Sequence, residues 1–226
     1  MIIGVSGKIA SGKDLVGQMV QYIGTVDKPS FEEFTARYEG DKWLVLPNWK
    51  VKKFADALKD NVCTLLGVDR DMLEDRDYKE AELGEEWWYY QHADGIKPYG
   101  FWKGADKELA DSRFLVKPTP RLILQRLGTE GVREIIHPNA WVNAATAGYN
   151  GQHWVFTDMR FPNELETVVS RGGVTIRVQR GDGNTGSHPS EIALDDYMDK
   201  FDYVIDNNGT MEELYDQVAQ IALTTK

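Results

Sequence analysis

The 226-residue sequence is nearly free of cysteine: its one thiol, Cys63, can form no disulfide within the chain. That composition fits a reducing compartment. Long apolar runs are also missing, and none approaches the ~20 residues that span a bilayer. The N-terminus lacks the basic segment and the long apolar core of a signal peptide. We therefore expect a cytoplasmic protein with no membrane partner.

An excess of positive charge is absent too. The chain has 26 Lys and Arg against 36 Asp and Glu, a formal net charge of −10. Broad binding to nucleic acid needs a basic surface, so we expect no nucleic-acid partner. A phosphate ligand remains compatible with this charge, because a few backbone N–H groups and one or two basic side chains can bind an anion locally.

What the chain does contain is short apolar strand-like segments that alternate with segments of helical periodicity. We expect strands at 1–5, 49–54, 153–157, 174–178 and 201–205, and helices at 15–23, 55–66, 119–127, 138–147, 162–171 and from 210 onward. This alternation predicts an α/β fold with a central, mostly parallel sheet between layers of helices. We expect one domain over 1–226 with insertions around 27–48, where a hairpin could turn at Gly40-Asp41, and around 80–113.

The first expected strand leads directly into a glycine-rich loop. Gly7-x-x-x-x-Gly12-Lys13 has the spacing of a P-loop, and an apolar-periodic helix follows it. Glycines allow successive N–H groups to point at phosphate oxygens, the lysine reaches the β- and γ-phosphates, and the helix adds its positive N-terminal end. The sequence therefore predicts a nucleoside triphosphate site. Its expected nucleotide-binding residues are Gly7, Ser11, Gly12, Lys13, Asp14 and Leu15.

Asp14 departs from the usual pattern, because a Ser or Thr that contacts Mg²⁺ normally follows the lysine. A carboxylate is also a hard oxygen ligand, so Asp14 is a candidate metal residue; the alternative is an acidic residue favoured by the helix dipole. A second polar pair, Asp158 and Arg160, follows a buried strand at the sheet edge where α/β proteins bind ligands. Asp158 can bind Mg²⁺ through water, act as a base or bind a sugar hydroxyl, and Arg160 can bind a phosphate with two hydrogen bonds. The alternative is a structural ion pair between them.

Several segments together resemble the deoxynucleoside monophosphate kinases of tailed bacteriophages. They are Gly7–Asp14, Phe54–Lys59, Gln125–Glu130 with Arg133 and Trp141, Thr157–Glu164, His188–Glu191 and Asn207–Thr210. They follow one another in the family's order over nearly the whole chain, and 27–48 and 80–113 are the main parts not covered. Thr157–Glu164 is the most distinctive of them.

The resemblance implies a P-loop kinase-type three-layer fold and a transferase that moves the γ-phosphoryl group of ATP, with Mg²⁺, to a (deoxy)nucleoside 5′-monophosphate. It implies Lys13, Arg160 and Asp158 as catalytic residues and Asp14 as the metal residue. If a phage encodes the chain, the compartment is the host cytoplasm. The implied substrate residues are Arg121, Gln125, Gly128, Thr129, Trp141, Asp158, Arg160 and Glu164.

Two rival functions stay open. The loop and the Ala55-x-x-Leu58-Lys59 segment also resemble phosphomevalonate kinase and dephospho-coenzyme A kinase, whose acceptors are not nucleoside monophosphates. A nucleotide-binding regulator would keep the loop but would need no arginines around a second phosphate. The aromatic run Trp87–Tyr90 is interpreted as packing or as a subunit interface, so a homodimer is among the partners considered.

Overall fold

The structure is a computed structural model that describes residues 1–39, 48–93, 95–99, 114–181 and 192–224. The chain forms two compact units, which are described separately. The first contains Met1–Asp56 and Val142–Lys226, and the second contains Ala57–Trp141. Within the described residues, every helix is too short or too polar to cross a membrane.

A five-stranded sheet forms the centre of the first unit. Its strand order is β2 (Trp49–Lys52), β6 (His153–Met159), β1 (Ile2–Gly7), β7 (Val174–Gln179) and β8 (Tyr203–Asp206), and each neighbouring pair is parallel. The predicted α/β fold is confirmed. All six residues of β1 are buried, as expected of a central strand in a parallel sheet that is covered on both faces.

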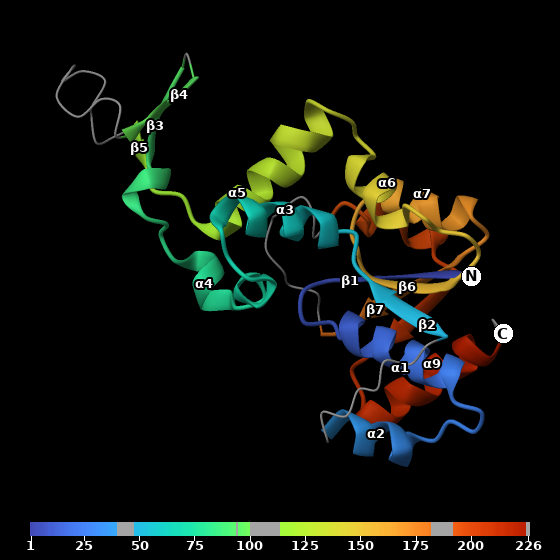
Figure 1. Ribbon diagram of the computed structural model, residues 1–226. Coiled ribbons are helices and arrows are strands. Elements are labelled where there is room, and N and C mark those ends of the chain that lie inside the picture. The colour runs from blue at the N-terminus through green and yellow to red at the C-terminus, as the bar shows by residue number, and fades with distance from the viewer. Residues whose placement is uncertain (40–47, 94, 100–113, 182–191, 225–226) are drawn as a thin grey trace. The chain divides into compact units, whose positions relative to one another are not determined.

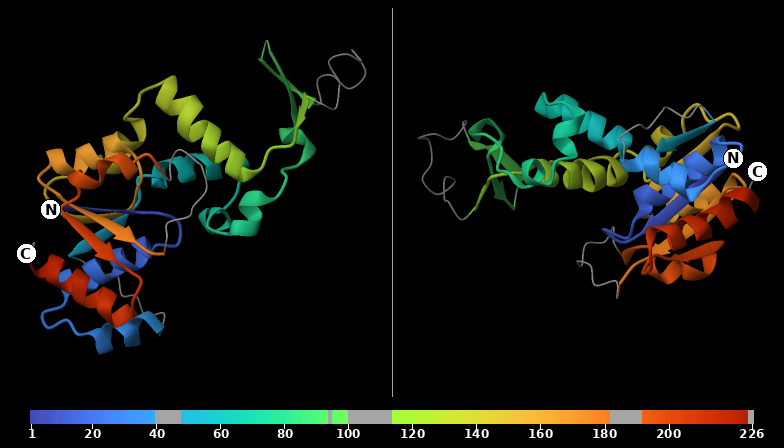
Figure 2. Two further views of the ribbon diagram at one scale, coloured as in Figure 1. Left: turned by 180° about the vertical axis from the view of Figure 1, so that it is seen from behind. Right: turned by 90° about the horizontal axis from the view of Figure 1, so that it is seen from below.

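Helices cover both faces of this sheet (Figures 1 and 2). On one face α1 (Lys13–Thr25), α2 (Phe31–Glu39) and α9 (Met211–Thr224) pack over the β1 side chains of Ile3 and Val5. On the other face, α6 (Ala140–Thr146) and α7 (Pro162–Ser170) pack over Ile2 and Phe156. Because successive side chains of a strand point to opposite faces, β1 contributes to both cores. The result is the predicted three-layer arrangement.

Local signals in the sequence fix the ends of two helices. At α9, Thr210 N–H and Glu213 Oε2 lie 2.6 Å apart and Glu213 N–H donates to Thr210 Oγ1 at 3.2 Å, which confirms the predicted capping box. At α7, the buried Glu164 accepts hydrogen bonds from the backbone N–H of Arg160 and of Phe161, at 2.7 and 3.1 Å. Both helices therefore begin where a glutamate of the first turn bonds to backbone N–H groups that immediately precede the helix.

The strand order also fixes where a ligand can bind. After β1 the chain adds β2 and β6 on one side of it, and then β7 and β8 on the other side. A parallel sheet binds ligands outside the carboxyl ends of its strands where this change of direction occurs. That point is the end of β1, where the glycine-rich loop begins.

The second unit is built from short elements. They are α3 (Asp56–Leu66, whose first residue belongs to the first unit), η1 (Arg70–Leu73), α4 (Arg76–Glu80), η2 (Glu85–Trp87), β3 (Tyr89–His92), β4 (Gly95–Pro98), β5 (Leu115–Val116), α5 (Pro120–Arg126) and η5 (Leu127–Glu134). The three strands form an antiparallel sheet in the order β4-β3-β5. Thr119 caps α5 by accepting from Leu122 N–H, as predicted. The helix then continues as the π-helix η5, a rare conformation that is found frequently at functional sites.

One local prediction is wrong. The hairpin expected within 27–48 is replaced over Phe31–Glu39 by α2, because Phe34 is buried against Tyr22 and Tyr215 on a helical face. The expected turn at Gly40-Asp41 lies outside the described residues. The single domain with insertions around 27–48 and 80–113 stays a prediction, and 100–113 are not described.

Candidate active site

The glycine-rich loop joins β1 to α1 through a tight turn. Ser11 N–H donates to the carbonyl oxygen of Lys8 at 3.2 Å. Gly12 has φ +95°, a left-handed conformation that side chains other than hydrogen strain. A Cβ atom on Gly7 would lie 2.5 Å from Ser11 Oγ and 2.6 Å from the carbonyl oxygen of Val178. Both predicted glycines are therefore required by the backbone path of the loop.

A residue from the far end of the chain supports this loop. The buried side chain of Asn207 donates through Nδ2 to the carbonyl oxygen of Ser11 at 2.8 Å. A Cβ on Gly12 would lie 2.5 Å from the same Nδ2 atom. The segment after β8 thus holds the backbone of the loop in place. The P-loop spacing pattern alone assigns no role to Asn207.

Lys13 is the first residue of α1, and its Nζ donates to the carbonyl oxygen of Lys8 at 2.6 Å. The ammonium group therefore lies over the loop. Gly12, the N-cap of α1, contributes no side-chain hydrogen bond, so the N–H groups of the first turn have no side-chain cap there. Such N–H groups attract anions. Leu15 is half-buried and packs on the core formed by α1, α2 and α9.

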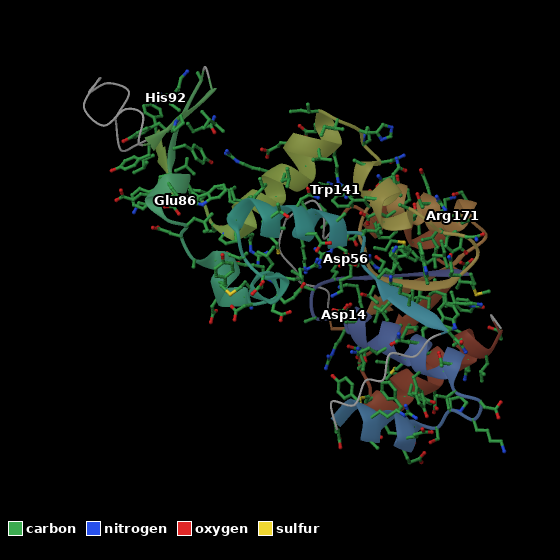
Figure 3. The ribbon with its side chains drawn as sticks, viewed as in Figure 1. Asp14, Asp56, Glu86, His92, Trp141 and Arg171 are labelled. Carbon is green, nitrogen blue, oxygen red and sulfur yellow. The ribbon has the colours of Figure 1, made fainter. Side chains whose placement is uncertain are left out.

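Asp14 lies at the start of α1 (Figure 3) and has two partners. Its Oδ1 accepts a hydrogen bond from the hydroxyl of Thr157 at 2.6 Å. The same oxygen lies 3.3 Å from Nζ of Lys53. Thr157 is a buried residue near the carboxyl end of β6, and Lys53 follows β2. The carboxyl ends of two strands therefore meet the first turn of α1 at this carboxylate.

Asp158 fixes the turn that follows β2. Its Oδ1 accepts from Phe54 N–H at 2.7 Å and its Oδ2 accepts from Ala55 N–H at 3.0 Å. Burial of the carboxyl group raises the pKa of Asp158, although these two hydrogen bonds and the charge of Arg160 act in the opposite direction. Asp158 and Arg160 thus lie at one edge of the sheet, as predicted, with both Asp158 oxygens bonded to backbone.

Sequence reasoning missed a buried cation beside the loop. Arg177 of β7 is 5% exposed, donates to Ser6 Oγ at 3.0 Å and pairs with Asp195 Oδ1 at 2.6 Å. Asp195, in η6 (Asp195–Lys200), also lies 3.3 Å from Nζ of the loop residue Lys8. The detectable signal was a charged residue between the apolar residues Ile176 and Val178 of a predicted strand.

Five of the predicted substrate residues belong to the second unit: Arg121, Gln125, Gly128, Thr129 and Trp141. Arg121 pairs with Glu80, with Nε and Oε1 2.5 Å apart. The buried Trp141 donates from Nε1 to the carbonyl oxygen of Gly128 in η5 at 2.9 Å. Gln125 and Thr129 are exposed. The predicted set Gln125–Trp141 is therefore centred on the π-helix.

The residues of the loop fit a triphosphate. Ser11 Oγ is buried and has no hydrogen-bond partner within the described residues, so it has a donor and acceptor capacity that a phosphate oxygen can satisfy. The close contacts at Gly7 and Gly12 leave no room for side chains there. Asp14 supplies an exposed carboxylate of the kind that Mg²⁺ prefers. Among the described residues, groups of three or more His, Cys, Asp or Glu that could bind a metal without a nucleotide are absent.

Comparison with known proteins gives relatives of similar kind. The chain is 31% identical over 139 residues to the "Deoxynucleotide monophosphate kinase" of Escherichia phage RB69. The alignment covers 58% of this chain and 54% of the relative. It is 32% identical over 127 residues to the "Putative deoxynucleotide monophosphate kinase" of Acanthamoeba polyphaga mimivirus, covering 50% and 65%. It is 34% identical over 117 residues to "Uncharacterized protein ORF77" of Ictalurid herpesvirus 1, covering 47% and 50%.

No protein-family model matches the chain. The matched region spans about half to two thirds of the length of these curated relatives. The similarity nevertheless agrees with the one read from the ordered motifs, since two of the relatives carry the same name. The resemblance to viral deoxynucleotide monophosphate kinases is therefore confirmed.

Proposed function

We propose that the chain catalyses transfer of the γ-phosphoryl group of ATP to a deoxynucleoside 5′-monophosphate, with ADP and a deoxynucleoside diphosphate as products. The observation that carries the proposal is the loop between β1 and α1. Its glycines are enclosed by Val178 and Asn207, and its buried Ser11 hydroxyl has no partner within the described residues. The names of two relatives supply the acceptor class.

The reaction needs positioning and positive charge more than covalent chemistry. An oxygen of the acceptor phosphate forms a bond to the γ-phosphorus, the bond from that phosphorus to the β,γ-bridging oxygen breaks, and ADP leaves. The N–H groups of the loop and of the first turn of α1 would bind the phosphate oxygens. Lys13 would exchange the Lys8 carbonyl for the β- and γ-phosphates, because an anion is a stronger acceptor than a carbonyl.

Mg²⁺ bound to the triphosphate would neutralise part of its charge, and Asp14 is the residue that we assign to it. On the acceptor side, Arg160 is assigned to phosphate. Glu164 fixes the backbone at Arg160, and Asp158 fixes the turn after β2. Arg121, Gln125, Gly128, Thr129 and Trp141 of the second unit are assigned to the monophosphate. The π-helix that contains Gly128 and Thr129 supports this assignment, since π-helical segments are found frequently at functional sites.

The proposal is tested by incubating the purified protein with ATP, Mg²⁺ and each of the four common deoxynucleoside monophosphates while ADP formation is followed. We expect ADP formation that depends on an acceptor. Lys13→Ala should abolish it. Lys28→Ala is the matched control, because Lys28 is exposed beyond the end of α1 and should leave the rate unchanged.

Two results would contradict the proposal. ATP binding without turnover on any monophosphate would favour a nucleotide-binding regulator. Turnover only with a non-nucleotide phosphate of the phosphomevalonate or dephospho-coenzyme A type would place the chain with other P-loop kinases.

The role assigned to Arg160 on the acceptor side is tested by comparing Arg160→Gln with the unchanged protein. We expect lost turnover with ATP affinity retained.

A further inference from the structure

A lysine outside the glycine-rich loop lies against the loop's unusual aspartate. Nζ of Lys53 is 3.3 Å from Asp14 Oδ1, and the Thr157 hydroxyl donates to that same oxygen at 2.6 Å. Both contacts are made by Oδ1, and the Asp14 side chain is 68% exposed. One carboxylate oxygen is thus bound by protein, while much of the side chain stays accessible at the site proposed for phosphate.

The backbone around Lys53 is fixed by carboxylates. Lys53 N–H donates to Asp56 Oδ2 at 2.9 Å, and the next two N–H groups, of Phe54 and Ala55, donate to Asp158. Three successive N–H groups therefore bind carboxylate oxygens in the turn after β2. The Lys53 side chain is only 31% exposed, although most lysines are solvated. The turn holds its ammonium group at the carboxyl edge of the sheet.

The charge at position 14 explains why such a lysine is needed. In the usual P-loop a neutral hydroxyl follows the lysine. A carboxylate there adds a negative charge beside a triphosphate that is itself an anion, and like charges at short range repel each other. Paired with the Lys53 ammonium group, Asp14 becomes part of a neutral pair and presents its second oxygen without a net repulsive charge.

We propose that Lys53 is a nucleotide-site residue that compensates the charge of Asp14 and so allows this loop to bind a nucleoside triphosphate. The inference rests on the proposed function only in requiring that the loop bind a triphosphate, and it does not depend on the acceptor. Lys53 and Asp14 act as a unit: the lysine is required because the aspartate is present. Thr157 fixes the carboxylate oxygen that faces Lys53.

The test is a double-mutant cycle read as ATP affinity by calorimetry, with and without Mg²⁺ and with no acceptor added. The variants are Lys53→Met, Asp14→Ser and the pair combined. Asp14→Ser restores the hydroxyl of the usual loop. Lys50→Met is the matched control, since Lys50 is an exposed lysine of β2, the strand that Lys53 follows. Far-UV circular dichroism and a thermal melt establish that each variant is folded, and Lys53→Gln replaces Lys53→Met if the latter is not.

We expect Lys53→Met to raise the Kd for ATP about tenfold or more, which corresponds to about 1.4 kcal/mol. In the Asp14→Ser background the same change should alter the Kd by less than about threefold, because no carboxylate remains to be compensated. Lys53→Arg should retain most of the affinity. Lys50→Met should bind ATP like the unchanged protein.

Two outcomes overturn the inference. Unchanged affinity in Lys53→Met would show that Asp14 needs no compensation. An equal loss in both backgrounds would show that Lys53 acts independently of Asp14. Either result is distinguishable from failure of the proposed function, which would appear as absent phosphoryl transfer in the unchanged protein while ATP binding and the cycle remain measurable.

Discussion

The side-chain amide of Asn207 donates a hydrogen bond to the carbonyl oxygen of Ser11, 196 positions earlier in the chain, at 2.8 Å. The backbone N–H of Asn207 donates to the carbonyl oxygen of Gln179 at 2.8 Å. Asn207 therefore links the end of β7 to the glycine-rich loop. The loop must present its N–H groups in one arrangement to bind phosphate. This arrangement therefore depends on a residue from the last third of the sequence.

Replacement of Asn207 by Ala should weaken both the fold and the loop. The buried Ser11 carbonyl would lose its side-chain donor, at a cost of about 1–3 kcal/mol in the free energy of unfolding. The Kd for ATP should rise as well, since the loop backbone loses its support. Urea denaturation and calorimetry measure the two effects. Asn208→Ala is the control, because its side chain contacts Gly181 and Asp206 and not the loop; equal loss of ATP affinity in both variants would contradict the prediction.

Gly12→Ala should abolish ATP binding. The new methyl group would lie 2.5 Å from Asn207 Nδ2, and the residue would be held at φ +95°. Gly67→Ala separates these effects: Gly67 also has a positive φ, +67°, but open space surrounds its Cβ position. We expect Gly67→Ala to lower stability by only about 1–2 kcal/mol and to leave ATP affinity unchanged. ATP binding retained by Gly12→Ala would show that the loop does not need this glycine.

Local chemistry made much of this fold predictable from sequence. The strand and helix periods located all five strands of the central sheet to within a few residues, and Thr210 with Glu213 marked the start of α9, because these signals act between near neighbours. The hairpin within 27–48 failed because tertiary packing decides that segment: Phe34 is buried against rings from α1 and α9. The π-helix η5 was not predicted from the sequence: we expected an ordinary helix over 119–127.

The site was predictable only in part, for a related reason. Gly7, Gly12 and Lys13 form a contiguous motif whose spacing encodes its geometry. Lys53, Asn207 and Arg177 contact Asp14, Ser11 and Ser6, respectively. They come from parts of the chain that only the folded sheet brings close, so spacing carries no information about them. The roles assigned to Asp158 and Arg160 stay predictions.

Loss of Asp195 should lower the free energy of unfolding more than loss of Lys8, which is its other cationic partner beside Arg177. Asp195→Ala removes the anionic partner of the buried Arg177, and breaking such a pair costs about 3–5 kcal/mol when fully buried. Because Asp195 is 38% exposed, we expect about 2 kcal/mol. Lys8→Met removes a more exposed pair and should cost about 1 kcal/mol or less. Chemical denaturation measures both, and a larger effect of Lys8→Met would contradict the assignment.

Two replacements of Trp141 separate its structural contact from its predicted contact with the acceptor. Trp141→Phe removes the donor to the Gly128 carbonyl but keeps an aromatic ring, and should lower the free energy of unfolding by about 1–2 kcal/mol. Trp141→Leu removes the ring as well. If the ring contacts a nucleobase, the KM for the monophosphate should rise in Trp141→Leu well above its value in Trp141→Phe. Equal KM values would limit Trp141 to supporting the π-helix.

Asp158 should make stability fall as the pH rises above its unfolded pKa. Burial raises the pKa of the folded carboxyl above 3.8, so between the two pKa values the folded state holds more protons than the unfolded state. The free energy of unfolding therefore decreases through this window.

Asp158→Asn cannot titrate and should lose this contribution to the pH dependence of the free energy of unfolding. It should also cost about 1–3 kcal/mol at neutral pH, because an amide group replaces one acceptor of the Phe54 and Ala55 N–H groups. Urea denaturation across this pH range measures both effects, with the exposed Asp27→Asn as the control for loss of one carboxylate. Identical slopes in Asp158→Asn and the unchanged protein would show that this carboxyl group titrates alike in the folded and unfolded states.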